Sequence, residues 1–222
     1  NIKENIDKFD SLFICNPSNP IGRVYDLSEL IEVLTKHNKL LIIDETFMEF
    51  VEKEEQYSLV KYIENNSNIF IIKAVTKFFG MPGLRLGYGV SSNKKLLENM
   101  YKIKEPWSIN TFADILSNYI FKEDVYIKES KEYFVKERDF MLKNLNKIKE
   151  IKAYKTDTNF ILIKLNNKTA KELKKELFIK GNILIRDASN FRNLDENYLR
   201  VAIKTHAENV ELIKQLIKIL GE

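Results

Sequence analysis

Two hydrophobic patterns alternate along the first part of the chain, one typical of buried strands and one typical of helices. The apolar run 40–43 is continuous, which is typical of a strand buried on both faces of a parallel sheet. In the segment that begins at Asp26, apolar residues recur at helical spacing, and Glu29 stands at the position that a capping box requires. We expect strands at 12–15, 40–43, 69–72 and 84–90, with helices that begin at Asp26 and cover 58–64. This order predicts an α/β fold.

The second part of the chain changes from a long helical region to a short α/β unit. Residues 93–150 have a helical pattern that is broken by Pro106. After it we expect strands at 159–165, 183–186 and 198–203, and helices at 169–179 and 208–220. The sequence therefore predicts three regions. Residues 1–105 are expected to be part of a large domain with a mostly parallel sheet. Residues 106–150 are expected to be connecting helices, and residues 151–222 a small C-terminal α/β domain.

Composition narrows the class of protein. The 222 residues are 44% hydrophobic and 31% charged, the balance of a folded globular protein. The net charge of +4 is spread over mixed signs, so we expect neither nucleic acid nor membrane as a partner. One cysteine and two histidines offer no internal disulfide and no zinc-ligand spacing. We expect a cytoplasmic protein, since no apolar run approaches the roughly 18 residues that span a bilayer and no export signal is visible.

Proline and glycine gather in two loops, 16–22 and 80–89, and each loop adjoins a predicted buried strand. Ligands of open α/β sheets bind beyond the carboxyl ends of the strands. Asp44 occupies another such end, and Lys77 lies in the loop that follows the third strand. Taken alone, Asp44 could be a turn or cap residue and Lys77 a surface lysine. Their order along the chain with Asn19 and Arg85 makes the case for a site.

This ordered set resembles the fold-type I pyridoxal-phosphate enzymes of the aminotransferase class I/II group. The segment NPSNPIG is similar to the N-P-x-N-P-T-G turn of that family, and DETF is similar to D-E-x-Y. The segment TKFFGMPGLRLGY is similar to the lysine motif that ends in G-x-R-x-G. The resemblance covers essentially the whole chain. It implies the corresponding fold, with a homodimer that binds a small phosphorylated amino acid.

The resemblance also implies a role for each matching residue toward pyridoxal 5'-phosphate. Lys77 would form a Schiff base with the aldehyde, and Asp44 would hold the proton on the pyridine nitrogen. Asn19 would donate to the phenolic oxygen, while Thr76 and Arg85 would bind the phosphate. The family commonly has Tyr at the position of Phe47, so one donor to the phenolic oxygen is lost here. The Asn19–Pro20 bond is expected to be cis.

Substrate anchoring is assigned to two arginines near the C-terminus. Arg200 matches the family's carboxylate-binding arginine, and Arg186 on the preceding strand is a candidate for a further contact to an anionic group. The alternative for Arg186 is a structural salt bridge. For Arg85 the alternative is a surface ion pair.

The fold does not decide the reaction, because one cofactor serves several chemistries. The segments EPWSIN and ILIRDASNF look similar to the threonine-phosphate decarboxylase branch of the family, which acts in cobalamin biosynthesis and is related to histidinol-phosphate aminotransferases. The resemblance thus implies decarboxylation of L-threonine O-3-phosphate to 1-amino-2-propanol O-phosphate, with aminotransfer as the alternative. The family's phosphate-cradling helix precedes the Asn-Pro turn in chain order. We therefore expect a C-terminal portion of the enzyme, and an inactive fragment is a further alternative.

Overall fold

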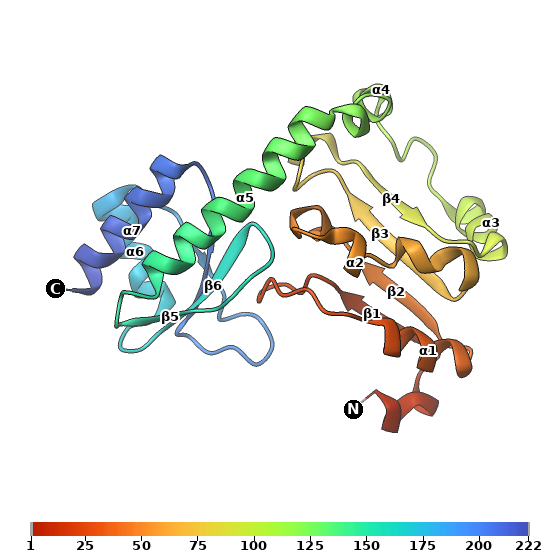
Figure 1. The fold of residues 1–222 in the computed structure, drawn as a ribbon, viewed down its shortest axis with the longest axis horizontal. Coiled ribbons are helices and arrows are strands. Elements are labelled where there is room, and N and C mark those ends of the chain that lie inside the picture. Colours follow the sequence, from red (N-terminus) through yellow and green to blue (C-terminus); the bar gives the residue numbers. More distant parts are fainter. Residues whose placement is uncertain (1, 222) are drawn as a thin grey trace. The chain divides into compact units, whose positions relative to one another are not determined.

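The computed structural model describes residues 2–221, which form two compact units (Figure 1). The first unit runs through Pro17 and continues over Val24–Lys128, and the second comprises Ser18–Arg23 and the chain from Glu129 onward. The sequence placed boundaries at 105 and 150. The units instead divide inside a single long helix, and the turn Ser18–Arg23 belongs to the second unit.

A four-stranded sheet forms the centre of the first unit. Its strands are β1 Ser11–Cys15, β2 Leu40–Asp44, β3 Ile69–Ala74 and β4 Gly87–Val90, in that spatial order. The first three strands are parallel, and β4 pairs antiparallel to β3. The predicted mostly parallel α/β sheet is therefore confirmed. The strand expected at 84–90 begins three residues later, because Arg85 takes a left-handed backbone with φ of 55° after a short 3-10 turn.

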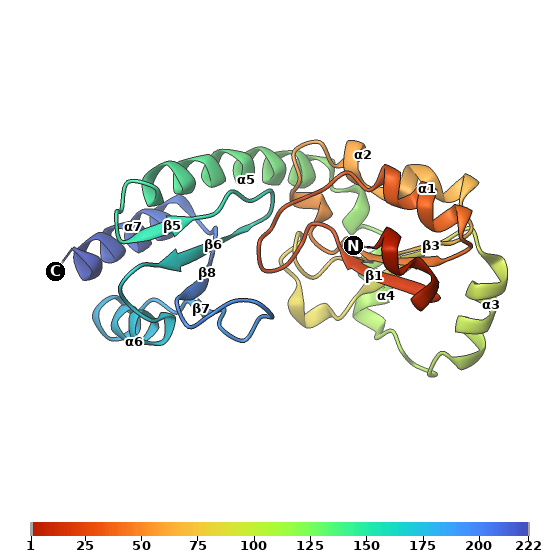
Figure 2. The same ribbon diagram turned by 90° about the horizontal axis from the view of Figure 1, so that it is seen from below.

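Helices and 3-10 turns connect these strands. The helices are α1 Ser28–Lys36, α2 Glu54–Tyr57, α3 Lys94–Ile103 and α4 Thr111–Ser117, and the 3-10 segments are Lys3–Lys8, Met48–Phe50, Leu59–Asn65, Pro82–Leu84 and Ile120–Lys122. Figure 2 shows α1 on one side of the sheet and α4 on the other. The capping box expected at Asp26 is wrong. The Asp26 carboxylate accepts a hydrogen bond from the backbone N–H of Ser28 at 2.9 Å, and Leu27 occupies the N-cap. The helix expected at 58–64 is a 3-10 helix.

The core of the first unit lies between the sheet and α1. Leu34, Leu41, Ile43, Ile69 and Ile71 are each at most 1% exposed. Burying a side chain of this size contributes about 1.5 to 3 kcal/mol, so these contacts fix the strand positions on which the loops depend.

The second unit has its own antiparallel sheet. Its strands are β5 Ile151–Ala153, β6 Phe160–Leu165, β7 Arg186–Asp187 and β8 Tyr198–Ala202, in the order β5-β6-β8-β7. The helices are α6 Ala170–Gly181 and α7 His206–Leu220, and both begin with a complete capping box. The predicted strands and helices are present, but the strand expected at 183–186 is reduced to β7, and β5 was not predicted. Three residues are too few to show a period.

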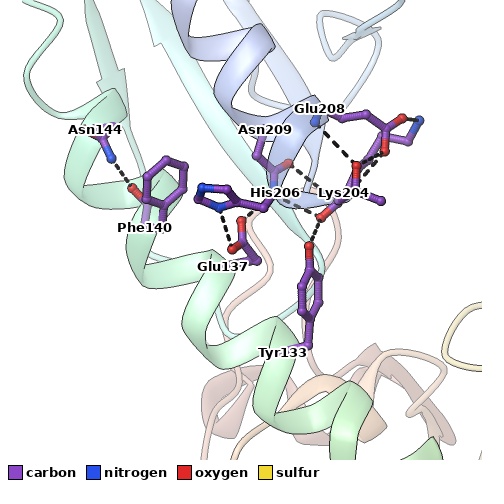
Figure 3. Close-up of polar contacts among 9 residues, drawn as sticks. Tyr133, Glu137, Phe140, Asn144, Lys204, His206, Glu208 and Asn209 are labelled. Atoms are coloured by element: carbon purple, nitrogen blue, oxygen red, sulfur yellow. Dashed lines mark hydrogen bonds and ion pairs between the residues drawn. The ribbon is translucent and has the colours of Figure 1, made fainter.

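The long helix α5, Asp124–Leu145, crosses from the first unit into the second. Its later turns are fixed to α7 by Glu137, which is 3% exposed (Figure 3). The Glu137 carboxylate accepts from Nδ2 of Asn209 at 2.8 Å and lies 2.9 Å from Nδ1 of His206. The hydroxyl of Tyr133 donates to the carbonyl of Lys204 at 3.0 Å. These contacts explain why the units divide near residue 128.

Candidate functional site

Asp44 ends β2 and is held by its own turn. Its Oδ1 accepts hydrogen bonds from the backbone N–H of Thr46, at 2.9 Å, and from the Thr46 hydroxyl. The carboxylate is half-buried and faces Cys15, its register partner on β1, whose Sγ lies 4.0 Å from Oδ2. Burial, and then the charge of Asp44, raises the pKa of the Cys15 thiol. Asp44 is thus a turn residue and also an acceptor at the carboxyl end of the sheet.

Thr76 and Lys77 lie in the loop directly after β3, the strand next to β2. Lys77 is exposed and Thr76 is half-buried. The ladder between β3 and β4 continues for one residue, because Val75 donates to the carbonyl of Leu86 at 3.2 Å. Thr76 and Arg85 come next on these two segments. Thr76 and Arg85 therefore lie at the edge of the sheet where β3 ends. Because β2 runs parallel to β3, Asp44 at the end of β2 lies at the same edge.

Arg85 presents its guanidinium to solvent. One of its groups, Nη1, donates to the carbonyl of Pro82 at 3.0 Å. Among residues 2–221 no carboxylate forms an ion pair with Arg85, so the surface ion pair considered for it is wrong. Four N–H donors remain for an anion.

Asn19 belongs to the second unit, where Arg200 is its partner. Nη1 of Arg200 donates to Oδ1 of Asn19 at 2.7 Å, and the guanidinium stacks 4.5 Å from the ring centroid of Phe160. The turn is anchored by the carbonyl of Gly22, which accepts from the backbone N–H of Asp157 at 2.8 Å. The expected cis peptide bond before Pro20 is confirmed. Asn19 and Arg200 thus form one preassembled pair.

Arg186 and Arg200 are direct register partners on β7 and β8. Burial, and then the charge of Arg186, lowers the pKa of Arg200. Arg186 donates to Oδ1 of Asn190 at 3.1 Å. Within the described part of the chain it makes no ion pair, so the structural salt bridge considered for it is wrong. Two cations on adjacent strands attract an anion to this surface.

The predicted residues therefore form two groups. Asp44, Thr76, Lys77 and Arg85 belong to the first unit, whereas Asn19, Arg186 and Arg200 belong to the second. That all of them bind one ligand stays a prediction.

Sequence reasoning missed two contributors, Thr46 and Phe160. Thr46 stands two residues after an aspartate, which is the spacing of an Asx turn and could have been noticed. The stacking of Phe160 on Arg200 depends on the pairing of β6 with β8 and has no local signal.

In the described part of the chain, no helix is long and apolar enough to cross a bilayer. No three or more His, Cys, Asp or Glu side chains of those residues are grouped to hold a metal ion.

Comparison with known proteins identifies a family for this chain. Residues 1–216 match the family model for aminotransferase class I and II. A Caldanaerobacter subterraneus protein named "Putative threonine-phosphate decarboxylase" is 42% identical over 215 residues, which is 95% of this chain and 58% of that protein. A histidinol-phosphate aminotransferase of Methanosphaera stadtmanae is 33% identical over 217 residues, covering 96% of this chain and 58% of that protein.

Solved structures give a similar result. The histidinol-phosphate aminotransferase of Clostridium acetobutylicum has a TM-score of 0.94 at 36% identity, covering 99% of this chain and 66% of that one. The L-threonine-O-3-phosphate decarboxylase of Porphyromonas gingivalis has a TM-score of 0.86 at 28% identity, covering 96% and 65%. The chain spans somewhat under two thirds of the length of these relatives.

Proposed function

Because the chain belongs to the aminotransferase class I and II family, we propose that it acts with pyridoxal phosphate in the decarboxylation of L-threonine O-3-phosphate to 1-amino-2-propanol O-phosphate. The observation that carries this proposal is the 42% identity, over 95% of the chain, to the Caldanaerobacter protein of that name. The role in cobalamin biosynthesis, the cytoplasmic setting and the substrate are parts of the same proposal.

The side chains of the first unit fit the cofactor. Pyridoxal phosphate supplies, when bound, an electron sink for the electron pair released as a bond to the substrate Cα breaks. Among the residues that the structure describes, Oδ2 of the Asp44 carboxylate has only a thiol as a hydrogen-bond partner. A thiol is a weak donor, so Oδ2 can accept a hydrogen bond from the protonated ring nitrogen. A ring nitrogen that stays protonated favours the flow of electrons toward it.

Lys77 and Arg85 fit the two other groups of the cofactor. The exposed amine of Lys77 would hold the cofactor through its aldehyde. Once the amine of the substrate has displaced it, the released Lys77 amine could move a proton to or from the reacting carbon. The remaining donors of Arg85 suit a phosphate, because a planar guanidinium can donate two parallel hydrogen bonds to it. The Thr76 hydroxyl follows next on the paired segment and can add a third donor.

The arginines of the second unit fit a substrate with two anionic groups. One N–H of the Arg200 guanidinium donates to Asn19, and its remaining N–H groups are available to the α-carboxylate. Arg186 lies on β7, directly opposite Arg200 on β8, and is available to the phosphate ester. Holding both ends of the substrate decides which bond at Cα is oriented for cleavage, which is how position selects the reaction.

The second candidate is aminotransfer to or from a phosphorylated substrate such as histidinol phosphate. The TM-score of 0.94 to the Clostridium acetobutylicum aminotransferase favours it. A non-catalytic piece that folds without holding the cofactor is the third candidate, since the chain spans only 58% of the Caldanaerobacter protein.

The experiment that separates these candidates is an incubation with L-threonine O-3-phosphate and pyridoxal phosphate in the absence of any keto acid. Decarboxylation predicts release of CO2 under these conditions. Aminotransfer predicts no CO2, and glutamate that forms only after 2-oxoglutarate is added. A chain that does neither supports the third candidate.

The lysine assignment has a separate test. Borohydride reduction of the chain with pyridoxal phosphate is expected to fix the cofactor to the peptide that contains Lys77. Lys77→Ala should lose the labelled peptide, and Lys95→Ala serves as the control because Lys95 is an exposed lysine like Lys77. Equal labelling of the Lys77→Ala variant would refute the assignment.

We also propose that the protein acts as a homodimer. Large apolar side chains are exposed on the part of the first unit around α3 and α4, among them Ile103 at 81%, Trp107 at 98% and Phe112 at 76%. Exposed apolar area of this kind is typical of an interface. Sedimentation equilibrium should give twice the chain mass, and a monomer at micromolar concentration would refute this part of the proposal.

A further inference from the structure

The two oxygens of the Asp44 carboxylate have different surroundings. Oδ1 accepts two hydrogen bonds, one from the backbone N–H of Thr46 at 2.9 Å and one from the Thr46 hydroxyl. A carboxylate oxygen has about two lone-pair sites, so these two donors saturate Oδ1.

The other oxygen, Oδ2, keeps acceptor capacity. Its hydrogen-bond partner in the described part of the chain is the Cys15 thiol, at a Sγ to Oδ2 distance of 4.0 Å. A thiol is a weak donor, and this length is the long limit for sulfur. Because burial and the charge of Asp44 raise the pKa of the Cys15 thiol, it stays protonated near neutral pH. It is therefore a neutral neighbour and does not add a second negative charge beside the carboxylate.

From these contacts we infer that Thr46 is a positioning residue, which occupies Oδ1 of Asp44 and so assigns Oδ2 to the ring N–H of pyridoxal phosphate. This inference rests on the proposed function. The family motif D-E-x-Y leaves the position of Thr46 open, so the role comes from this chain's own contacts.

A purely structural role for Thr46 makes a different prediction. The turn after β2 needs only the backbone N–H of Thr46, which any residue except proline supplies. The hydroxyl is an additional donor to the same oxygen. A charge-assisted bond of this kind limits rotation of the carboxylate and stabilises its charged form. Removing the hydroxyl while keeping the backbone therefore separates positioning from turn formation.

The test compares two ligands and three variants. The ligands are pyridoxal phosphate and its 1-deaza analogue, in which a C–H replaces the ring nitrogen, so that the analogue has no N–H for Asp44. Their dissociation constants are measured by absorbance and fluorescence titration for the 222-residue chain. The variants are Thr46→Val, which keeps shape and β-branching, Thr46→Ser, which keeps the hydroxyl, and Thr35→Val, which removes a threonine hydroxyl from α1.

We expect Thr46→Val to weaken binding of pyridoxal phosphate about fivefold, the equivalent of one ordinary hydrogen bond, and to leave the affinity for the analogue unchanged. Thr46→Ser should restore the wild-type preference between the two ligands, and Thr35→Val should keep it. Circular dichroism checks folding, and Thr46→Ala replaces Thr46→Val if the latter does not fold.

Equal losses for both ligands in Thr46→Val would overturn the inference and leave the proposed function standing, provided the wild-type chain prefers pyridoxal phosphate. A wild-type chain that binds neither ligand, or both equally well, has no contact between Asp44 and the ring nitrogen. That result would overturn the cofactor role in the proposed function and the inference with it.

Discussion

Replacing Gly22 by alanine tests how the Asn-Pro turn is attached to the second unit. Gly22 has a φ of +78°, a conformation that residues with a Cβ rarely adopt. An alanine Cβ would also lie 2.1 Å from Oγ1 of Thr156 and 2.7 Å from Oγ1 of Thr158. Both distances are far shorter than a van der Waals contact, so the turn or the threonines must move.

The expected cost has two parts. The left-handed backbone costs an alanine about 1 kcal/mol, and overpacking costs about 1 to 3 kcal/mol more. We therefore expect Gly22→Ala to lower the free energy of unfolding of the second unit by about 3 kcal/mol. The turn carries Asn19, so its bond to Arg200 should be disturbed as well.

Gly80 offers a matched control. Its φ is +63°, but no atom lies within 4 Å of the Cβ that alanine would add. Gly80→Ala should therefore cost only the backbone part, about 1 kcal/mol.

Urea unfolding followed by circular dichroism measures both costs, and hydrogen exchange of peptides from 151–222 shows whether the loss lies in the second unit. The double variant Gly22→Ala/Thr156→Ala removes the nearest atom and should recover part of the stability. If Gly22→Ala costs no more than Gly80→Ala, the turn is not packed against these threonines and our account of its attachment is wrong.

Three further changes test other contacts. Lys73→Met removes the amine that lies 3.4 Å from the fully buried carboxylate of Glu45, and urea unfolding should show a loss of about 3 kcal/mol; an unchanged midpoint would contradict the pair. The pKa of Glu208 is lowered from 4.5 to about 2, chiefly by its hydrogen bond from Lys204, so its contribution to stability is complete above pH 4.5 and is lost as the pH falls toward 2. Thermal unfolding of Glu208→Gln should therefore depend less on pH in that window than the wild type does, and parallel curves would refute the assignment. Met141→Ala removes a side chain with no exposed area from the second core and should cost about 3 kcal/mol in urea, whereas a cost below about 1 kcal/mol would show that α5 does not belong to this core.

The elements were predicted best where the signal is local. The apolar run 40–43 and the strand 159–165 appear as β2 and β6, because hydrophobic period and flanking turn residues act over a few positions. Prediction was poorer at 84–90, where the left-handed Arg85 delays the start of the strand to Gly87, and at Asp26, whose carboxylate accepts a hydrogen bond in a turn and forms no capping box. In both places the local backbone conformation differs from the one that the residue pattern predicts.

The sequence by itself determined the α/β class and the order of most strands and helices, since these depend on local periods. Its resemblance to a known family singled out Asn19, Asp44, Lys77 and Arg85 as candidate site residues. The tertiary structure alone decided which residues meet. Asn19 and Arg200 are separated by 181 positions and still share a 2.7 Å hydrogen bond, and Arg186 faces Arg200 because two strands pair. Such contacts come from the packing of whole elements, where free energy is gained by burying area between segments distant in the chain, and no short window of sequence contains that information.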